Sequence, residues 1–191
     1  MRILEGIVTT RSPSGDANIA PMGPFVDNAF RRLVLRPFRT STTYRNLKTH
    51  GEGVFHVTDD VLLLAQSAVG LPSPMPRLAK ASKIDGFVLC DACRAYEFRV
   101  LSIDDRDDRT RIEAEVVQQT RFRDFFGFNR AMHAVLEAAI LATRLHLLPT
   151  DQVAADMTKL QVIVDKTGGA TEHEAFDFLR AYIQQHVPDR C

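Results

Sequence analysis

Residues 36–47 read Arg36-Pro37-Phe38-Arg39-Thr40-Ser41-Thr42-Thr43-Tyr44-Arg45-Asn46-Leu47. Four consecutive hydroxyl side chains, Thr40 to Thr43, follow Arg39 and precede a short predicted helix that Gly51 ends. Serine and threonine at a helix N-terminus satisfy its first free N–H groups, and these groups also attract anions. An arginine beside them adds a forked donor that suits phosphate. The segment therefore predicts a site for a phosphorylated ligand, with an ordinary capped helix as the alternative.

The composition is that of a globular protein without a strong charge bias. The chain has 191 residues, which is enough for one core with a smaller appended lobe. Lys+Arg and Asp+Glu balance at 24 each, which argues against a dedicated nucleic-acid binder. No apolar run is long enough to cross a bilayer, and the N-terminal residues lack a signal-peptide layout. Three cysteines give no disulfide framework, so the expected location is cytoplasmic.

The first part of the chain has the patterns of a β-structure. Residues 95–103 and 111–119 alternate apolar and charged side chains, and the charged run 104–109 between them suits a hairpin tip. These patterns predict an amphipathic antiparallel pair. Two prolines and a glycine in residues 21–24 exclude a central strand there but allow a fixed, extended backbone. Short strands at close spacing indicate a small barrel over residues 1–125.

The rest of the chain, residues 126–191, is expected to be helical. Asn129 is a suitable N-cap for the first helix, which Pro149 ends. Gly168 breaks the second helix, and Thr171 with Glu174 forms a capping box for the third. The three helices are expected over about residues 130–147, 150–164 and 171–187, and Pro188 is expected to stop the third.

Two motifs resemble a known superfamily. Asn18-Ile19-Ala20-Pro21-Met22-Gly23 is similar to the Asn-x-Ala-Pro loop of the flavin-reductase-like, FMN-binding split-barrel superfamily. Thr43-Tyr44-Arg45-Asn46 is similar to its Thr-x-x-Asn helix start, about twenty residues later. The helical part, with the segments 128–137 and 166–169, resembles an uncharacterised branch, a domain-of-unknown-function family with a helical extension. The resemblance covers essentially the whole chain.

This resemblance implies an α+β fold, a small antiparallel split β-barrel of the FMN-binding type in residues 1–125 with a C-terminal three-helix segment, 126–191, packed on it. It implies a homodimer with FMN near the interface. Along the flavin ring it places Asn18, Ala20, Pro21, Met22 and Gly23. Around the phosphate it places Arg39, Thr40, Ser41, Thr42 and Thr43, with Asn46 bracing the loop. Many members have Ser or Thr where this chain has Gly23, so a side-chain contact to the ring at this position is in question.

The function that follows from the resemblance is that of an FMN-dependent oxidoreductase, with a nicotinamide as electron donor. The protein would supply position and ring hydrogen bonds while the flavin supplies the electron chemistry. No side chain stands out as a catalytic acid or base. The alternatives are a non-catalytic flavin-binding or carrier module, a partner-docking protein, and an interaction protein that has lost its cofactor. A deazaflavin or pterin in place of FMN also stays open.

Three other patterns carry weaker predictions. Cys90 and Cys93 form a C-x-x-C without the second pair that zinc needs, so no metal is predicted and a buried strand thiol is expected. His133 and Glu137 share a face of a helix that is expected to be buried, where a salt-bridged face is the main interpretation and a metal or anion site the alternative. The segment 121–128 interleaves basic and aromatic residues and is interpreted as a core or dimer-interface hinge rather than a nucleic-acid surface.

Overall fold

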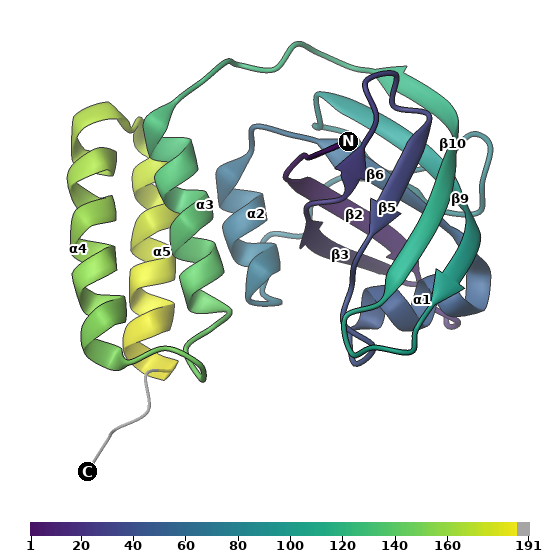
Figure 1. The fold of residues 1–191 in the computed structure, drawn as a ribbon. Helices are drawn as coiled ribbons and strands as arrows, with labels where there is room; N and C mark the ends of the chain where they lie inside the picture. The colour runs from purple at the N-terminus through teal and green to yellow at the C-terminus, as the bar shows by residue number, and fades with distance from the viewer. Residues whose placement is uncertain (187–191) are drawn as a thin grey trace. The chain divides into compact units, whose positions relative to one another are not determined.

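The structure is a computed structural model, and it describes residues 1–186. The chain divides into two compact units. The barrel unit comprises Met1–Thr58 and Pro76–Phe125, and the helical unit comprises Asp59–Met75 together with the chain from Phe126 onward. The chain thus leaves the barrel after residue 58, returns at residue 76 and leaves again after residue 125 (Figure 1).

The barrel unit is built from short strands and one helix. Its elements are β1 (Arg2–Ile3), β2 (Gly6–Arg11), β3 (Ala17–Met22), β4 (Phe25–Val26), β5 (Arg32–Leu35), α1 (Thr42–His50), β6 (Glu52–Val57), β7 (Leu78–Lys80), β8 (Phe87–Leu89), β9 (Arg94–Asp104) and β10 (Arg111–Arg121). In the described chain eight strands form one antiparallel sheet in the order β1-β4-β5-β10-β9-β6-β2-β3, and β7 pairs with β8. The sheet curls on itself and α1 lies at one end of it (Figure 1).

The sheet order confirms the antiparallel split barrel. β1 and β3 stand at the two ends of the order and do not pair with each other, so the barrel remains open. The predicted β9–β10 pair is present, with Arg111 opposite Asp104 beside the turn. Pro21 lies in β3, which is an edge strand, as the prolines required.

One charged residue of β9 is buried, although the alternating pattern predicted an exposed position. Glu97, in the middle of β9, is only 2% exposed. Its carboxylate accepts hydrogen bonds from Ser82 N at 3.0 Å, Ser82 Oγ at 2.8 Å and Lys83 N at 2.7 Å. Three donors stabilise a buried carboxylate that would otherwise be costly. The loop that follows β7 therefore covers this part of the sheet.

A buried histidine ties three strands together. His56, in β6, has no exposed surface. Its Nδ1 lies 3.2 Å from the carbonyl oxygen of Ile7, and its Nε2 accepts a hydrogen bond from Leu89 N at 3.0 Å. Accepting at Nε2 requires the neutral ring, with the proton on Nδ1. Burial lowers the pKa of His56 to about 4.

The helical unit has one helix more than the sequence predicted. Its helices in the described chain are α2 (Val61–Ala68), α3 (Arg130–Ala142), α4 (Thr150–Thr167) and α5 (Ala170–His186). α2 packs against α3 and α5, although about 60 residues separate it from α3 in sequence (Figure 1). It is an eight-residue apolar segment, and periodicity cannot assign such a short run to helix or strand. The Asp60 carboxylate caps it by accepting from Leu63 N at 2.9 Å.

The predicted helix ends are partly right. Asn129 is the N-cap of α3, and its Oδ1 accepts from Ala131 N at 2.7 Å. α3 ends at residue 142 rather than 147, and turns follow it. At α5 the capping carboxylate is Glu172, which accepts from Gly169 N at 2.8 Å, and not Glu174. Pro188, predicted to stop this helix, lies outside the described residues. None of the helices in residues 1–186 combines the length and apolar character that crossing a membrane requires.

Candidate functional site

The site predicted around residues 39–43 is the turn that leads into α1. Ser41 is the N-cap, with extended backbone angles. Its Oγ accepts from Tyr44 N at 3.1 Å and donates to the carbonyl oxygen of Phe38 at 2.7 Å. The Ser41 hydroxyl is therefore used to hold the turn and is not free to contact a ligand with its hydrogen.

The outer surface of this turn carries two hydroxyls and two guanidinium groups. Arg39, Thr40, Thr42 and Arg45 are exposed. Arg45 donates to the carbonyl oxygen of Thr40 at 2.9 Å and to Thr42 Oγ1 at 3.0 Å. Arg45 is not among the predicted site residues, although its spacing of three residues from Thr42 on a helix could have indicated the contact. No acidic side chain lies in the first turn of α1, so the positive end of the helix is not neutralised locally.

The hairpin between β9 and β10 supports this turn. Arg39 N donates to the carbonyl oxygen of Asp108 at 2.9 Å. Asp105 Oδ2 accepts from Lys48 Nζ at 2.7 Å and from the Tyr44 hydroxyl at 2.5 Å. The hydrogen bond from Lys48, followed by that from Tyr44, lowers the pKa of Asp105. The hairpin therefore fixes both the loop and the helix that follows it.

The inner surface of α1 is joined to β2 and β3 by a buried polar network. Thr43 and Asn46 are buried, and Asn18 in β3 is half-buried. The Asn18 amide donates to Thr43 Oγ1 at 3.1 Å and to Thr10 Oγ1 at 3.2 Å, and the Asn46 amide donates to Thr10 Oγ1 at 3.0 Å. The structure thus brings together three predicted site residues from two elements. Thr10 was missed, and its only signal was a polar residue at the end of an apolar strand.

The remaining predicted residues lie on β3 and directly after it. Ala20, Pro21 and Met22 pair with β2, and the other edge of β3 has no neighbouring strand within residues 1–186. A Cβ atom on Gly23 would come within 2.8 Å of Ile3 Cγ2 and 2.6 Å of Glu5 Oε1. The N-terminal segment therefore covers this position, and a side chain there would require Ile3 and Glu5 to shift.

The other patterns do not assemble into a site. Cys90 and Cys93 lie in the turn after β8, half-buried and buried respectively, rather than in a strand as expected. Within the described residues, no group of three or more His, Cys, Asp or Glu side chains could hold a metal ion. His133 and Glu137 are exposed on α3, so the expectation of buried charges is wrong.

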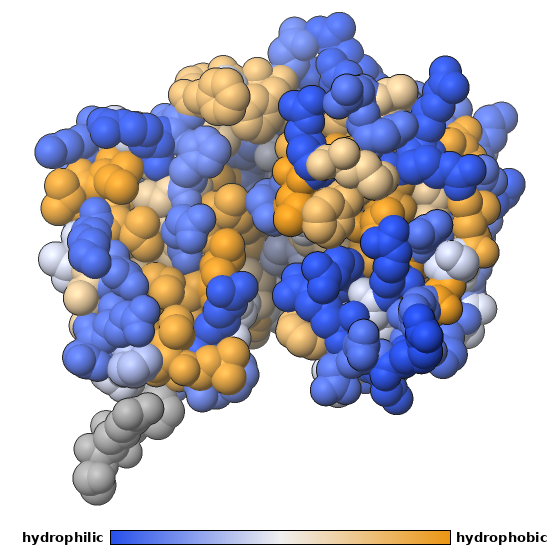
Figure 2. Space-filling model, viewed as in Figure 1, coloured by the Kyte–Doolittle hydropathy of each residue, from blue (hydrophilic) through white to orange (hydrophobic). Residues whose placement is uncertain are grey.

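The aromatic segment is exposed rather than part of a core. Phe126 and Phe128 are 79% and 99% exposed, and Phe122 and Phe125 are also exposed. The interpretation of this segment as core is therefore wrong. Apolar side chains also reach the surface of the helical unit, where Figure 2 shows them over α3 and α4. Leu147, after α3, is among these exposed apolar residues.

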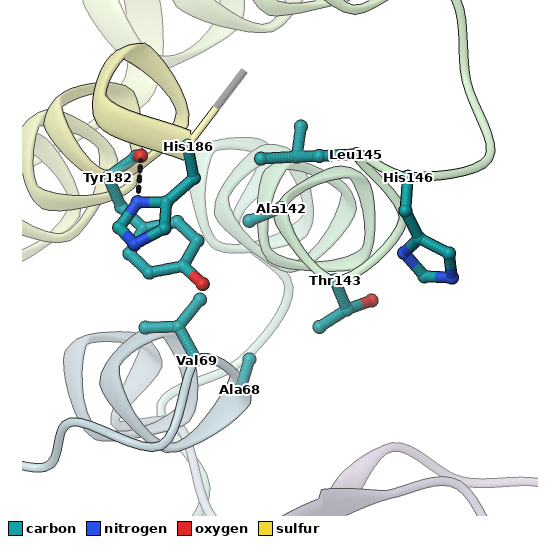
Figure 3. Close-up of a pocket in the computed structure, with 8 residues that line it drawn as sticks. All are labelled: Ala68, Val69, Ala142, Thr143, Leu145, His146, Tyr182 and His186. Atoms are coloured by element: carbon teal, nitrogen blue, oxygen red, sulfur yellow. Dashed lines mark hydrogen bonds between the residues drawn. The ribbon is translucent and has the colours of Figure 1, made fainter. Parts of the chain in front are cut away.

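The helical unit contains a cavity of about 390 Å³ between the C-terminal ends of α2, α3 and α5 (Figure 3). Its lining residues are Ala68, Val69, Ala142, Thr143, Leu145, His146, Tyr182 and His186. The rings of Tyr182 and His186 stack with centroids 4.0 Å apart, and His186 Nδ1 lies 2.8 Å from the carbonyl oxygen of Tyr182. None of the predicted cofactor residues lines this cavity.

Family models match most of the chain. The model described as "Protein of unknown function (DUF447) N-terminal domain" matches residues 4–122, and that described as "Protein of unknown function (DUF447)" matches residues 129–181. The chain belongs to the DUF447 family. The predicted membership of an uncharacterised branch is thereby confirmed. No curated protein matches this DUF447 chain in sequence.

Solved structures confirm the flavin-reductase-like fold of this DUF447 protein. An FMN-bound DUF447 protein from Methanosarcina mazei superposes with a TM-score of 0.80 at 22% identity, over 94% of each chain. The NADH:FAD oxidoreductase SgcE6 of Streptomyces globisporus gives a TM-score of 0.52 at 12% identity, covering 63% of this chain and 70% of its own. An FMN-binding protein from Thermus thermophilus with bound p-hydroxybenzaldehyde gives 0.52 at 15% identity, covering 62% and 71%.

Proposed function

We propose that this DUF447 protein binds FMN, with the phosphate at the entry of α1, and acts as a flavin-dependent oxidoreductase. The observation that carries the proposal is the exposed surface of the α1 turn, where Arg45 contacts the Thr42 hydroxyl and the Thr40 carbonyl oxygen, and where Arg39 and Thr40 are also exposed. A phosphate dianion binds where several donors meet at the positive end of a helix.

The residues of the turn fit such an anion. Thr42 Oγ1 accepts its hydrogen bond from Arg45, so the hydrogen of the Thr42 hydroxyl is left to donate outward. The N–H groups of Thr42 and Thr43 begin the helix, ahead of the Tyr44 N–H that Ser41 caps. No carboxylate in this first turn competes with a bound anion. In this proposal Arg39, Thr40, the hydroxyl and N–H of Thr42 and the N–H of Thr43 hold the phosphate. Ser41, whose N–H and hydroxyl both donate to the carbonyl oxygen of Phe38, shapes the turn, and Asn46 braces the loop.

The flavin ring would lie along β3. The residues proposed for this contact are Ala20, Pro21, Met22 and Gly23, whereas the amide of Asn18, in the same strand, is bonded to Thr10 and Thr43. Pro21 stiffens the strand, and the unpaired strand edge offers backbone N–H and C=O groups to a polar ring edge. Gly23 has no side chain and would therefore contribute only backbone groups.

Oxidoreduction is the activity that the fold neighbours favour. The M. mazei structure contains FMN and the S. globisporus protein is an NADH:FAD oxidoreductase. Bound FMN would supply hydride and electron transfer. The chain's own contribution is to hold the phosphate and orient the ring. We further propose a nicotinamide as electron donor and a homodimer as the assembly. A flavin carrier without turnover is the alternative.

The test begins with the visible spectrum of the purified protein and with calorimetric titration of the flavin-free form. A flavin band near about 450 nm is expected, together with FMN binding much tighter than riboflavin binding, since riboflavin lacks the phosphate. Absence of FMN binding would overturn the proposal. Anaerobic mixing of the FMN-loaded protein with NADH or NADPH then separates the enzyme, which bleaches the band, from a carrier, which does not. Light scattering after gel filtration reports whether the protein is a dimer.

A further inference from the structure

We infer that Thr10 is a positioning residue, which sets the spacing between the strand proposed for the flavin ring and the helix proposed for its phosphate. This inference rests on the proposed function. Thr10 lies in β2 and is 1% exposed. It cannot touch a ligand on the surface, and any effect on binding must pass through the residues that it holds.

Thr10 Oγ1 is the acceptor that joins the two parts of the site. It accepts from the Asn18 amide of β3 at 3.2 Å and from the Asn46 amide of α1 at 3.0 Å. The Asn18 amide also donates to Thr43 Oγ1 of α1 at 3.1 Å. A helix and a strand share no backbone ladder, so these side-chain bonds are the polar connection between α1 and the β2–β3 pair.

The same network changes the role expected for Asn18. An asparagine amide has two hydrogens, and both are used, one on Thr10 and one on Thr43. The Asn18 amide is therefore directed at α1 and does not donate to a flavin ring. Asn18, like Thr10, acts by holding β3 and α1 in register, which differs from the direct contact that the superfamily resemblance implies.

The ligand affected by this spacing is one that contacts both parts at once. FMN would reach from β3 to the α1 turn, whereas riboflavin would use only β3 and inorganic phosphate only α1. Replacing Thr10 by valine keeps the shape but removes the acceptor of both amides. A less rigid site should lose the most affinity for FMN, because FMN must contact both β3 and the α1 turn at once.

The chain offers a matched control in the adjacent residue. Thr9 is also 1% exposed and lies in the same strand. Its hydroxyl donates to the carbonyl oxygen of Phe87 in β8, on the opposite face of β2 from α1. Thr9→Val therefore removes one buried hydroxyl and one buried hydrogen bond without touching the network.

The experiment is calorimetric titration of FMN, riboflavin and inorganic phosphate into wild type, Thr10→Val, Thr10→Ser and Thr9→Val. We expect Thr10→Val to weaken FMN binding on the order of tenfold, with much smaller changes for riboflavin and phosphate. Thr10→Ser, which keeps the hydroxyl, should restore FMN binding, and Thr9→Val should leave the ratio of FMN to riboflavin affinity unchanged. Circular dichroism checks that each variant folds.

Equal losses for FMN and riboflavin in Thr10→Val, or the same loss in Thr9→Val, would overturn the inference, because Thr10 would then act only on stability. If Thr10→Val does not fold, Asn46→Ala breaks the other end of the same bond and the comparison of the three ligands is made with it. Wild type that binds no FMN would overturn the proposed function as well. Wild type that binds FMN, with no change in Thr10→Val, would overturn only the role of Thr10.

Discussion

The guanidinium of Arg45 lies against the hydroxyl of Thr42, with Nη2 3.0 Å from Oγ1. This contact places a fixed positive charge at the start of α1 and leaves the Thr42 hydrogen directed away from Arg45. The Arg45 guanidinium and the Thr42 hydroxyl therefore lie on the same exposed surface. Replacing the donor side chains of this surface tests whether it binds the phosphate.

Replacing Arg39 and Thr42 together by alanine should weaken FMN binding by ~2–4 kcal/mol, because two or more hydrogen bonds to a charged group are lost. Riboflavin binding should not change, since riboflavin has no phosphate. Isothermal titration with both ligands measures the difference. Arg32→Ala removes an exposed charge from β5 and serves as the control for net charge. Unchanged FMN affinity in the double variant would place the phosphate elsewhere.

The buried histidine predicts how stability depends on pH. Burial lowers the pKa of His56 from 6.5 to about 4. Between these two values the unfolded chain binds a proton that the folded chain does not, so the free energy of unfolding falls as the pH is lowered. The expected loss between about pH 7 and pH 5 is roughly 2 kcal/mol. Urea unfolding at the two pH values measures it.

This pH effect can be separated from that of carboxylates. Hydrogen bonds to basic side chains lower the pKa values of Asp91, Asp104 and Asp105, so these groups stay ionised in the same range. His56→Gln should flatten the pH dependence while lowering stability overall. His133→Gln, at an exposed position of α3, should retain it. A slope that persists in His56→Gln would contradict the assignment.

The glycine after β3 predicts a local packing cost. Gly23→Ala should lower the free energy of unfolding by about 1 kcal/mol or somewhat more, because the added methyl must displace Ile3 and Glu5. Gly169→Ala is the comparison, since there the methyl would meet only the flexible end of Glu172, at 3.2 Å. Urea unfolding of both variants checks the difference. Equal stabilities would mean that the N-terminal segment gives way without cost.

Several features could be predicted because they depend on residues close together in sequence. The alternation in β9 and β10 specified the hairpin, and Asn129 specified the start of α3. The hydroxyl run before α1 indicated a capped helix, and the structure shows that Ser41 is the cap. Each of these rests on a local period or on one side chain that meets a backbone group two or three residues away.

Other features were decided only by the tertiary structure. The sequence could not show that α2 packs with helices about 60 residues later, or that a loop covers Glu97. Among the hydroxyls of the α1 turn it could not separate Thr42, which faces outward, from Thr43, which meets Asn18. The orientation of Thr43 depends on Asn18, which lies on a distant strand. The local sequence therefore determined which chemical groups are present in the turn, and long-range packing determined which of them face outward.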